Sequence, residues 1–375
     1  MSRLDNPNSE IDLVSEAFRR VLGHRQYVSG PEVRELESLL AGWLQTRYAI
    51  GCNSGFGAHL LGLLALGIGP GSKIAVPAFA PASYLGALMR RGAVPVLIDV
   101  AANDFHMDPL ALADRLDNRG LDLVIVYHLF GGTVDVCGIL HLTGATPMME
   151  VVTFSLGAHI GERHAGSFGM LSISCLREET TIGAYGDAGM IWTDDQPLSE
   201  KLCRMREEDA RTDTHEGLLS GCFHQDSVHA GILLQKFGAW RESVKERNQQ
   251  GALLAHAILE QNVPGVVVPP FYNHNTAHFV VFAEHRDALV GYLRSQGIAA
   301  AAWWPVPIFL QPGFRHLRHR EGDFPEAERA ARMSLWLPLP GTECERDALV
   351  ARLAGFYASY RRYVCESPWE RVSQS

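Results

Sequence analysis

The order of apolar and polar residues divides the chain into two regions. In the first region, seven short apolar runs alternate with helical segments: YAIGC (48–52), KIAVP (73–77), VPVLI (94–98), DLVIVY (122–127), TPMME (146–150), MLSIS (170–174) and GMIWT (189–193). Short runs of this kind, separated by helices, are typical of parallel strands that are buried on both faces. The pattern therefore predicts an α/β fold with a seven-stranded, mostly parallel sheet and helices on both faces.

Helical periodicity marks the segments between and after these strands. Pro31 opens the segment VRELESLLAGWL, in which Val33, Leu36 and Leu40 recur on one helical face. Further helical patterns cover 198–211, 226–258, 286–296 and 345–363, and the last two are separated by an apolar run through Trp303 and Trp304. We predict a large α/β domain over 1–255, including an N-terminal arm, and a smaller C-terminal α+β domain over 256–375.

Composition narrows the class of protein. The 375 residues are 47% hydrophobic and 20% charged, which is enough apolar material for one large core and a smaller one. A formal charge of -9 provides no basic surface for nucleic acid or anionic lipid, so we expect neither as a partner. Because the first thirty residues lack an apolar leader and no run reaches membrane-spanning length, we expect a cytoplasmic protein with reduced cysteines.

Several ordered motifs carry a resemblance to a known family. They are YVSGPEVRELE (27–37), NSG (53–55), GAVPVLIDV (92–100), HLFG (128–131), GSFG (166–169), GAYGDAG (183–189) and GDFPEAER (322–329). With them the chain resembles, over nearly its whole length, the DegT-type sugar aminotransferases among the fold type I enzymes that use pyridoxal phosphate (PLP). The resemblance implies an aminotransferase-like fold, a homodimer with the site at the interface, and substrates similar to nucleotide-linked keto sugars.

The resemblance also implies cofactor-binding residues, and this sequence departs from them. The Schiff-base lysine should lie three residues before GAYGD, where Thr180 stands, and the aspartate that holds the PLP ring nitrogen is replaced by Val151. PLP chemistry needs both groups. The four lysines of the chain, Lys73, Lys201, Lys236 and Lys245, fall outside the loops at the carboxyl end of the predicted sheet.

The phosphate-binding and ring-stacking positions differ as well. Phe56 replaces the hydroxyl residue after NSG, and we expect its ring to fill the anion site at a helix N-terminus. Pro81 stands at the position of the stacking aromatic, and Phe309 at that of a family histidine. We therefore expect no cofactor. The histidines show no metal-ligand spacing, so we expect no metal either.

Candidate site residues follow from the same positions. Glu178, Glu179 and His128 are the candidate acid or base groups, since a buried glutamate beside an arginine, or a histidine at a strand end, can move protons. The alternatives are a solvated loop at 177–179 and a histidine that only holds loop backbone. The candidate substrate-binding residues are Ser54, Phe56, Tyr84, Phe154, Cys175, Arg177, Thr180 and Tyr185.

Two functional hypotheses remain open from the sequence. In the first, the chain is a PLP-independent enzyme on an aminotransferase scaffold, acting on a small polar metabolite of a sugar or secondary-metabolite pathway, and not a working transaminase. In the second, it is a non-catalytic pseudo-aminotransferase that supports another enzyme, as a homodimer or as a heterodimer with an active paralogue. The first predicts a hollow, polar pocket, and the second a cavity plugged by Phe56, Phe154 and Phe309.

Overall fold

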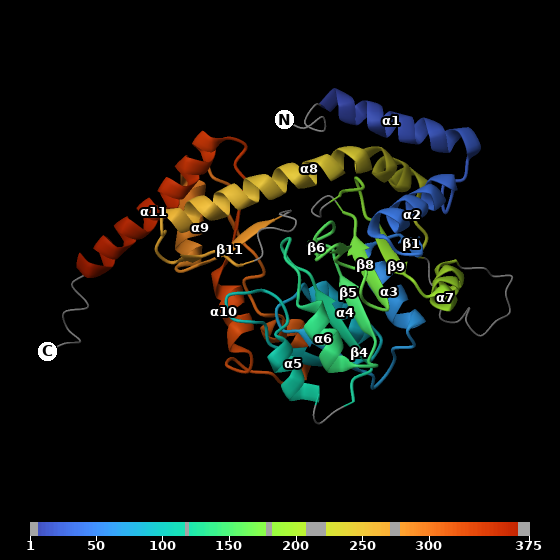
Figure 1. The fold of residues 1–375 in the computed structure, drawn as a ribbon, viewed down its shortest axis with the longest axis horizontal. Helices are drawn as coiled ribbons and strands as arrows, with labels where there is room; N and C mark the ends of the chain where they lie inside the picture. Colours follow the sequence, from blue (N-terminus) through green and yellow to red (C-terminus); the bar gives the residue numbers. More distant parts are fainter. Residues whose placement is uncertain (1–6, 117–119, 178–181, 208–222, 271–277, 367–375) are drawn as a thin grey trace.

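A seven-stranded sheet forms the centre of the protein. The computed structural model describes residues 7–116, 120–177, 182–207, 223–270 and 278–366 (Figure 1). The strand order is β1-β9-β8-β5-β4-β2-β3, and β9 runs antiparallel to both of its neighbours while the other strands are parallel to one another. The strands are β1 (Tyr48–Cys52), β2 (Lys73–Pro77), β3 (Val94–Ile98), β4 (Leu123–Tyr127), β5 (Met148–Val151), β8 (Leu171–Cys175) and β9 (Gly189–Thr193). The sequence prediction of seven strands in a mostly parallel sheet is confirmed.

Helices cover both faces of this sheet, which explains the continuous apolar runs in its strands. In β4, Ile125 and Tyr127 pack into one hydrophobic cluster, whereas Val124 and Val126 pack into another on the opposite face. The covering helices are α2 (Pro31–Leu44), α3 (Gly55–Ala65), α4 (Ala82–Arg90), α5 (Pro109–Leu116), α6 (Val136–Thr143) and α7 (Gln196–Arg206). A short hairpin, β6 (His159–Ile160) with β7 (Arg163–His164), lies outside the main sheet.

A second, four-stranded sheet follows in the C-terminal part, with the order β10-β11-β13-β12. Its apolar residues Phe279, Phe282 and Leu335 belong to the same hydrophobic cluster as Ile125 of the large sheet, so one core runs through both parts. The elements are β10 (Val266–Val267), β11 (Phe279–Ala283), α9 (Arg286–Ser295), β12 (Ala301–Ala302), η3 (Ile308–Leu310), η4 (Pro312–Leu317), α10 (Pro325–Met333), β13 (Ser334–Leu337) and α11 (Glu343–Glu366).

One long helix, α8 (Ser227–Glu260), connects the two parts and packs against α1 (Pro7–His24), α2 and α11 (Figure 1). The domain boundary expected between 255 and 256 falls inside this unbroken helix and stays a prediction.

Among the described residues, neither α8 nor any other helix has an apolar stretch long enough to cross a membrane.

A buried carboxylate fixes the loops at the centre of the sheet. Glu150 of β5 is fully buried, and its two oxygens accept hydrogen bonds from His128 Nε2 at 3.0 Å and from the backbone N–H groups of Gly166, Phe168 and Gly169 at 2.6 to 2.8 Å. Burial alone would raise the pKa of this carboxyl, but these hydrogen bonds outweigh it and lower the pKa below its ordinary value of 4.5.

Replacement of this carboxylate tests its contribution to stability. Glu150→Gln should lower the free energy of unfolding by about 3 kcal/mol at neutral pH, because the amide end would face three backbone N–H donors and the Nε2–H of His128 with one acceptor oxygen. Since the pKa of Glu150 is lower in the folded than in the unfolded protein, its contribution is present above pH 4.5 and is lost as pH falls through the folded pKa.

Urea unfolding of both proteins over a series of falling pH values measures this difference. The control is Glu242→Gln, which removes an exposed pair with Lys245 and should change the free energy of unfolding by less than about 0.5 kcal/mol. If the difference in free energy of unfolding between wild type and Glu150→Gln stayed constant as the pH was lowered, the stabilising role of the ionised Glu150 would be contradicted.

Candidate functional site

A large cavity lies at the carboxyl edge of the seven-stranded sheet, facing the four-stranded sheet. Its volume is about 660 Å³. The ends of β1, β2, β5 and β8 and the beginning of the antiparallel β9 all meet at this edge. Ligand sites of open α/β sheets form at this edge, because the loops that follow neighbouring parallel strands converge there.

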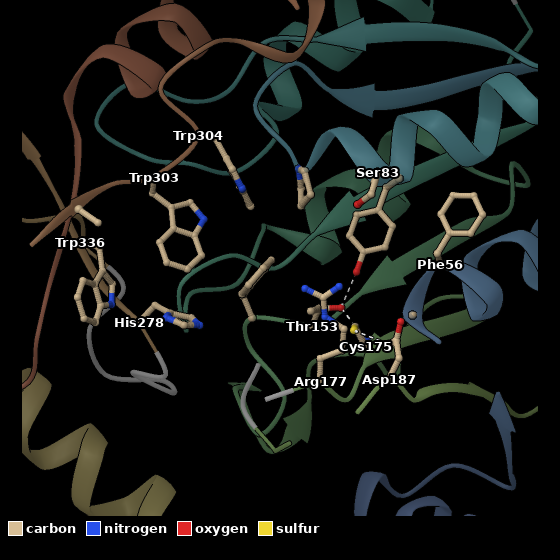
Figure 2. Close-up of a pocket in the computed structure, with 15 residues that line it drawn as sticks. Phe56, Ser83, Thr153, Cys175, Arg177, Asp187, His278, Trp303, Trp304 and Trp336 are labelled. Carbon is tan, nitrogen blue, oxygen red and sulfur yellow. Dashed lines mark hydrogen bonds between the residues drawn. The ribbon is translucent and has the colours of Figure 1, made fainter. Parts of the chain in front are cut away.

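One wall of the cavity comes from these loops (Figure 2). Its residues lie at the end of a strand, in the loop or helix that follows a strand, or just before β9: Gly55, Phe56, Pro81, Ser83, Tyr84, Thr153, Phe154, Cys175, Arg177 and Asp187. The polar side chains among them provide hydroxyl, thiol, guanidinium and carboxylate groups. This wall therefore provides both hydrogen-bonding partners and titratable groups to a ligand.

The opposite wall is aromatic and comes from the C-terminal part. Trp303 and Trp304 follow β12, Trp336 lies on β13, and His278 precedes β11. His278 packs on Trp303 with ring centroids 4.7 Å apart, and Phe154 of the first wall meets Trp303 and Trp304 edge to face at 5.8 and 5.7 Å. The three indoles line the cavity, and Trp303 and Trp304 join its two walls through Phe154 (Figure 2).

A chain of polar contacts runs along the first wall. The Tyr84 hydroxyl lies 2.8 Å from Thr153 Oγ1, and the same oxygen accepts the backbone N–H of Cys175 at 3.0 Å. The Cys175 thiol lies 3.9 Å from Asp187 Oδ1. Burial raises the pKa of Tyr84, and burial likewise raises the pKa of the Asp187 carboxyl, against the opposing charge of Arg177.

The N-terminus of α3 belongs to this wall. Ser54 caps it by accepting the backbone N–H of Gly57 at 2.8 Å, and the backbone N–H of Gly55 donates to the Asp187 carboxylate. The Phe56 ring lies instead beneath the guanidinium of Arg90, 4.9 Å from its centroid. The prediction that Phe56 fills the anion site is therefore wrong, since the carboxylate of Asp187 faces that helix end.

Five of the predicted substrate-binding residues line the cavity: Phe56, Tyr84, Phe154, Cys175 and Arg177. Three predicted residues, Glu178, Glu179 and Thr180, lie outside the described residues. Phe56 and Phe154 form walls and do not plug the space, and Phe309 is buried against Phe324 with ring centroids 4.9 Å apart. The plugged cavity of the second hypothesis is therefore absent from the described structure.

His128 is not on the cavity wall, contrary to expectation. Its side chain is fully buried, and its Nδ1 accepts the backbone N–H of Val134 at 3.3 Å, so the proton lies on Nε2, which donates to Glu150. Both ring nitrogens are used within the fold. This geometry favours the alternative reading, a histidine that holds loop backbone.

Ser54 and Tyr185 are also directed elsewhere. The Ser54 hydroxyl is used in the cap of α3, and it also donates to Asn53 Oδ1 at 3.2 Å. The Tyr185 hydroxyl donates to Glu10 of α1 at 2.6 Å, and Lys236 Nζ lies 4.3 Å from the centroid of its ring. Neither residue is on the cavity wall, so both expectations are corrected.

Sequence reasoning missed the residues that complete the cavity. They are Gly55, Pro81 as a lining residue, Ser83, Thr153, Asp187, His278, Ala301, Trp303, Trp304 and Trp336. A signal was present for two of them: Thr153 follows the end of β5 by two residues, and Asp187 belongs to the GAYGDAG motif. Nothing local marks Trp336 or His278, because only the packing of the second sheet brings them to the cavity.

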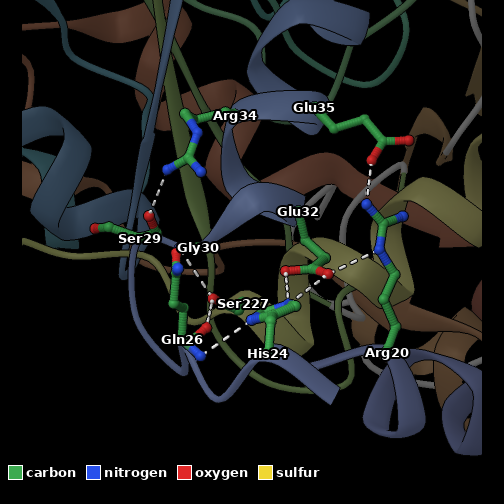
Figure 3. A network of polar contacts seen from close by, with 9 residues as sticks. All are labelled: Arg20, His24, Gln26, Ser29, Gly30, Glu32, Arg34, Glu35 and Ser227. Atoms are coloured by element: carbon green, nitrogen blue, oxygen red, sulfur yellow. Dashed lines mark hydrogen bonds and ion pairs between the residues drawn. The ribbon is translucent and has the colours of Figure 1, made fainter. Parts of the chain in front are cut away.

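A second cluster of titratable groups lies away from the cavity and has a structural role (Figure 3). Glu32 of α2 is fully buried, 2.8 Å from Arg20 Nε and 3.0 Å from His24 Nε2 at the end of α1. Nearby, Ser227 Oγ of α8 donates to the Gln26 carbonyl. These contacts fasten α1 and the turn after it to α2 and α8.

In the described part of the chain, His, Cys, Asp and Glu side chains nowhere gather in a group able to hold a metal ion.

Comparison with known proteins places the chain in a family. The model of the DegT/DnrJ/EryC1/StrS aminotransferase family matches residues 9–350. The chain belongs to this family. It is 29% identical to a UDP-N-acetyl-3-dehydro-alpha-D-glucosamine 3-aminotransferase of Acidithiobacillus ferrooxidans, with 92% of each chain covered. It is also 29% identical to a pleiotropic regulatory protein of Geobacillus stearothermophilus, covering 92% of this chain and 95% of the relative.

The solved structures agree with this family membership. The structure of DesV from S. venezuelae in complex with a ketimine intermediate has a TM-score of 0.83 and 26% identity, and it covers 92% of this chain and 94% of DesV. A DegT DnrJ EryC1 StrS aminotransferase from Brucella abortus has the same TM-score at 24% identity. The predicted aminotransferase-like fold is confirmed.

The predicted function is contradicted by these relatives. Sequence analysis gave a PLP-independent enzyme that is not a working transaminase, or a non-catalytic partner. Relatives that match about nine-tenths of the chain are named as sugar aminotransferases, among them a UDP-linked glucosamine enzyme and a dTDP-linked glucose transaminase of Streptomyces venezuelae. Neither independence from PLP nor loss of activity follows for this DegT-family chain.

The described cavity residues nevertheless do not fit PLP held through a Schiff base. None of the lining residues is a lysine. Lys201 Nζ donates to the Ala65 carbonyl and Lys236 Nζ to the Gly183 carbonyl, while Lys245 pairs with Glu242. Lys73 starts β2, at the opposite edge of the sheet. Val151 is apolar and buried, so it offers no carboxylate to the ring nitrogen of PLP.

The polar chain on the first wall predicts an order of mutational effects. Thr153→Val should lower the free energy of unfolding by about 2 kcal/mol, because the backbone N–H of Cys175 and the Tyr84 hydroxyl both lose their partner. Tyr84→Phe removes one hydroxyl and leaves the Thr153–Cys175 bond intact, so it should cost about 1 kcal/mol. Urea unfolding compares the two variants, and a larger loss for Tyr84→Phe would contradict this order.

Proposed function

We propose that this DegT-family protein binds a keto sugar linked to a nucleoside diphosphate in the cavity between its two sheets, and acts on the sugar in a biosynthetic pathway. The observation that carries the proposal is the contrast between the walls: three indoles face hydroxyl, guanidinium and carboxylate groups across a space of about 660 Å³. A cavity of this size suits a ligand of many atoms with both apolar faces and polar edges.

Hexose rings have this combination of surfaces. Their C–H faces pack on aromatic rings, for which Trp303, Trp304 and Trp336 provide the surface. Their hydroxyl edges need donors and acceptors, for which the first wall offers Ser83 and Asp187. Arg177, exposed on the loop after β8, is a cation that can pair with a diphosphate.

The names of the relatives support the same substrate class. The relatives of Acidithiobacillus ferrooxidans and Streptomyces venezuelae are named for UDP- and dTDP-linked amino sugars. Both names place the nitrogen at carbon 3 of a hexose. We therefore propose a sugar with a carbonyl group on the ring as the ligand whose reacting carbon enters the cavity.

Calorimetry tests the proposed ligand class with two stable probes, dTDP-glucose and UDP-N-acetylglucosamine. At least one should bind, and Trp336→Leu should weaken that binding about tenfold, because one aromatic contact contributes about 1.4 kcal/mol. The matched control is Trp43→Leu, which removes an indole from a separate small cavity beside α8 and should leave binding unchanged. If neither probe bound the folded wild-type protein, the proposal would fail.

The proposal includes a homodimer, supported by an exposed apolar stripe on α1. Ile11, Phe18 and Leu22 are all exposed, and their spacing of seven and four residues places them on one face of the helix. Exposed apolar stripes of this kind mark protein contacts. A second copy of the chain is the simplest partner, since most soluble oligomers are symmetric homodimers.

Light scattering during gel filtration measures the mass in solution. The wild-type chain of 41.3 kDa should elute as a species of twice that mass, and the double variant Phe18→Glu, Leu22→Glu as a monomer. Leu110→Glu, at an exposed leucine on α5, is the control and should remain dimeric. A wild-type chain that is monomeric at high concentration would contradict the homodimer and leave the heterodimer as the alternative.

A further inference from the structure

One thiol lies on the cavity wall among groups that can activate it. Cys175 is the last residue of β8 and lines the cavity, half-buried, as a free cysteine (Figure 2). The other free cysteines among the described residues lie elsewhere: Cys52 is buried in the core, and Cys137, Cys203 and Cys344 are exposed on helices. Among the cysteines that the structure describes, Cys175 is thus the one that a ligand in this cavity would meet.

The sulfur lies against the N-terminus of α3. A Cβ atom placed on Gly55, the first residue of that helix, would fall 2.9 Å from Cys175 Sγ and 2.4 Å from its Cβ, so only glycine permits this approach. Burial raises the pKa of the thiol, and against this larger effect the backbone N–H groups of Arg177 and Gly55 favour the thiolate form. The positive end of the helix dipole acts in the same direction.

The carboxylate of Asp187 can accept the thiol proton. Burial raises the pKa of the Cys175 thiol more than the amides of Arg177 and Gly55 lower it, so the group stays protonated near neutral pH. Asp187 Oδ1 lies 3.9 Å from Sγ, and burial raises the pKa of this carboxyl as well, which makes it a better proton acceptor. The exposed Arg177 guanidinium adds a positive charge beside both groups.

We propose that Cys175 is a nucleophile of this site and forms a reversible covalent adduct with the carbonyl carbon of the bound sugar. That the electrophile is a sugar carbonyl rests on the proposed function. The bond from sulfur to carbon forms as the carbonyl π bond breaks, and the thiol proton passes to Asp187. The resulting oxyanion, paired with Arg177, takes this proton back and leaves a neutral hemithioketal, so the step needs no further reactant.

The arrangement assigns a distinct role to each neighbour. Asp187 moves the proton, Arg177 stabilises the negative oxygen, and Thr153 fixes the end of β8 by accepting the Cys175 N–H at 3.0 Å. Gly55 admits the sulfur to the helix end. A thiol used only for packing would need neither the carboxylate at 3.9 Å nor the two backbone donors.

The experiment uses the full-length protein and glycolaldehyde labelled with ¹³C at its carbonyl carbon. NMR of the wild type should show the resonance of a sulfur-bound tetrahedral carbon. The resonance should be lost in Cys175→Ser and retained in Cys137→Ser, the matched control at an exposed thiol on α6. A resonance that survives unchanged in Cys175→Ser would overturn the proposal.

The role of Asp187 has its own readout. Asp187→Asn should slow adduct formation at least about tenfold, and the remaining rate should follow thiol ionisation alone as pH is raised. An unchanged rate and pH profile would refute the assignment of this base. If Cys175→Ser does not fold, alkylation of the Cys175 peptide by iodoacetamide in the wild type replaces it, and failure of glycolaldehyde to protect that peptide counts against the proposal.

This result is separable from the test of the proposed function. The probe dTDP-glucose carries no aldehyde or ketone on its sugar, so its binding to the wild type reports the ligand class without any adduct. Binding without an adduct would overturn the nucleophile and leave the ligand class standing. An adduct without nucleotide-sugar binding would support the nucleophile and reject the ligand class.

Discussion

The buried carboxylate of Glu150 is the constraint from which the arrangement of the site follows. It lies in β5 at the middle of the large sheet and binds the backbone of the 166–169 loop and the ring of His128 at the same time. An ionised carboxylate without these donors would be costly at zero exposure, so the loops must close around it. Thr153 and Phe154 follow three and four residues later, and their position on the cavity wall depends on this anchor.

The cavity combines two kinds of constraint on the backbone. Loops after parallel strands converge at one edge of the sheet, which brings Thr153 and Cys175 together although they are distant in sequence. The close approach of Cys175 to α3 depends on Gly55, where any side chain would collide with it. The aromatic wall depends on the core shared by the two parts, in which Trp304 packs against Phe79 and Phe130. The site is thus assembled from parts whose own stability does not depend on a ligand.

The sequence predicted the large sheet well because each strand is buried on both faces, which leaves a continuous apolar run such as LVIVY. It predicted five wall residues, since they follow strands, but it placed His128 on the wall and missed Trp336, whose contribution depends on how the second sheet packs. The functional inference failed for another reason. Replaced side chains at positions such as Val151 were interpreted as loss of the family's chemistry. Relatives that match about nine-tenths of the chain are, however, named as aminotransferases.

Asp187 places a negative charge on the cavity wall at the N-terminus of α3. A helix N-terminus ordinarily attracts anions, but the carboxylate of Asp187 already accepts the first backbone N–H of α3, so this end of the helix carries its own negative charge. Arg177 places a positive charge close to this carboxylate on the same wall. An anionic group on a ligand would be favoured on the Arg177 side and disfavoured on the Asp187 side, so the pair would act as a small fixed dipole that orients any ligand charged at one end only.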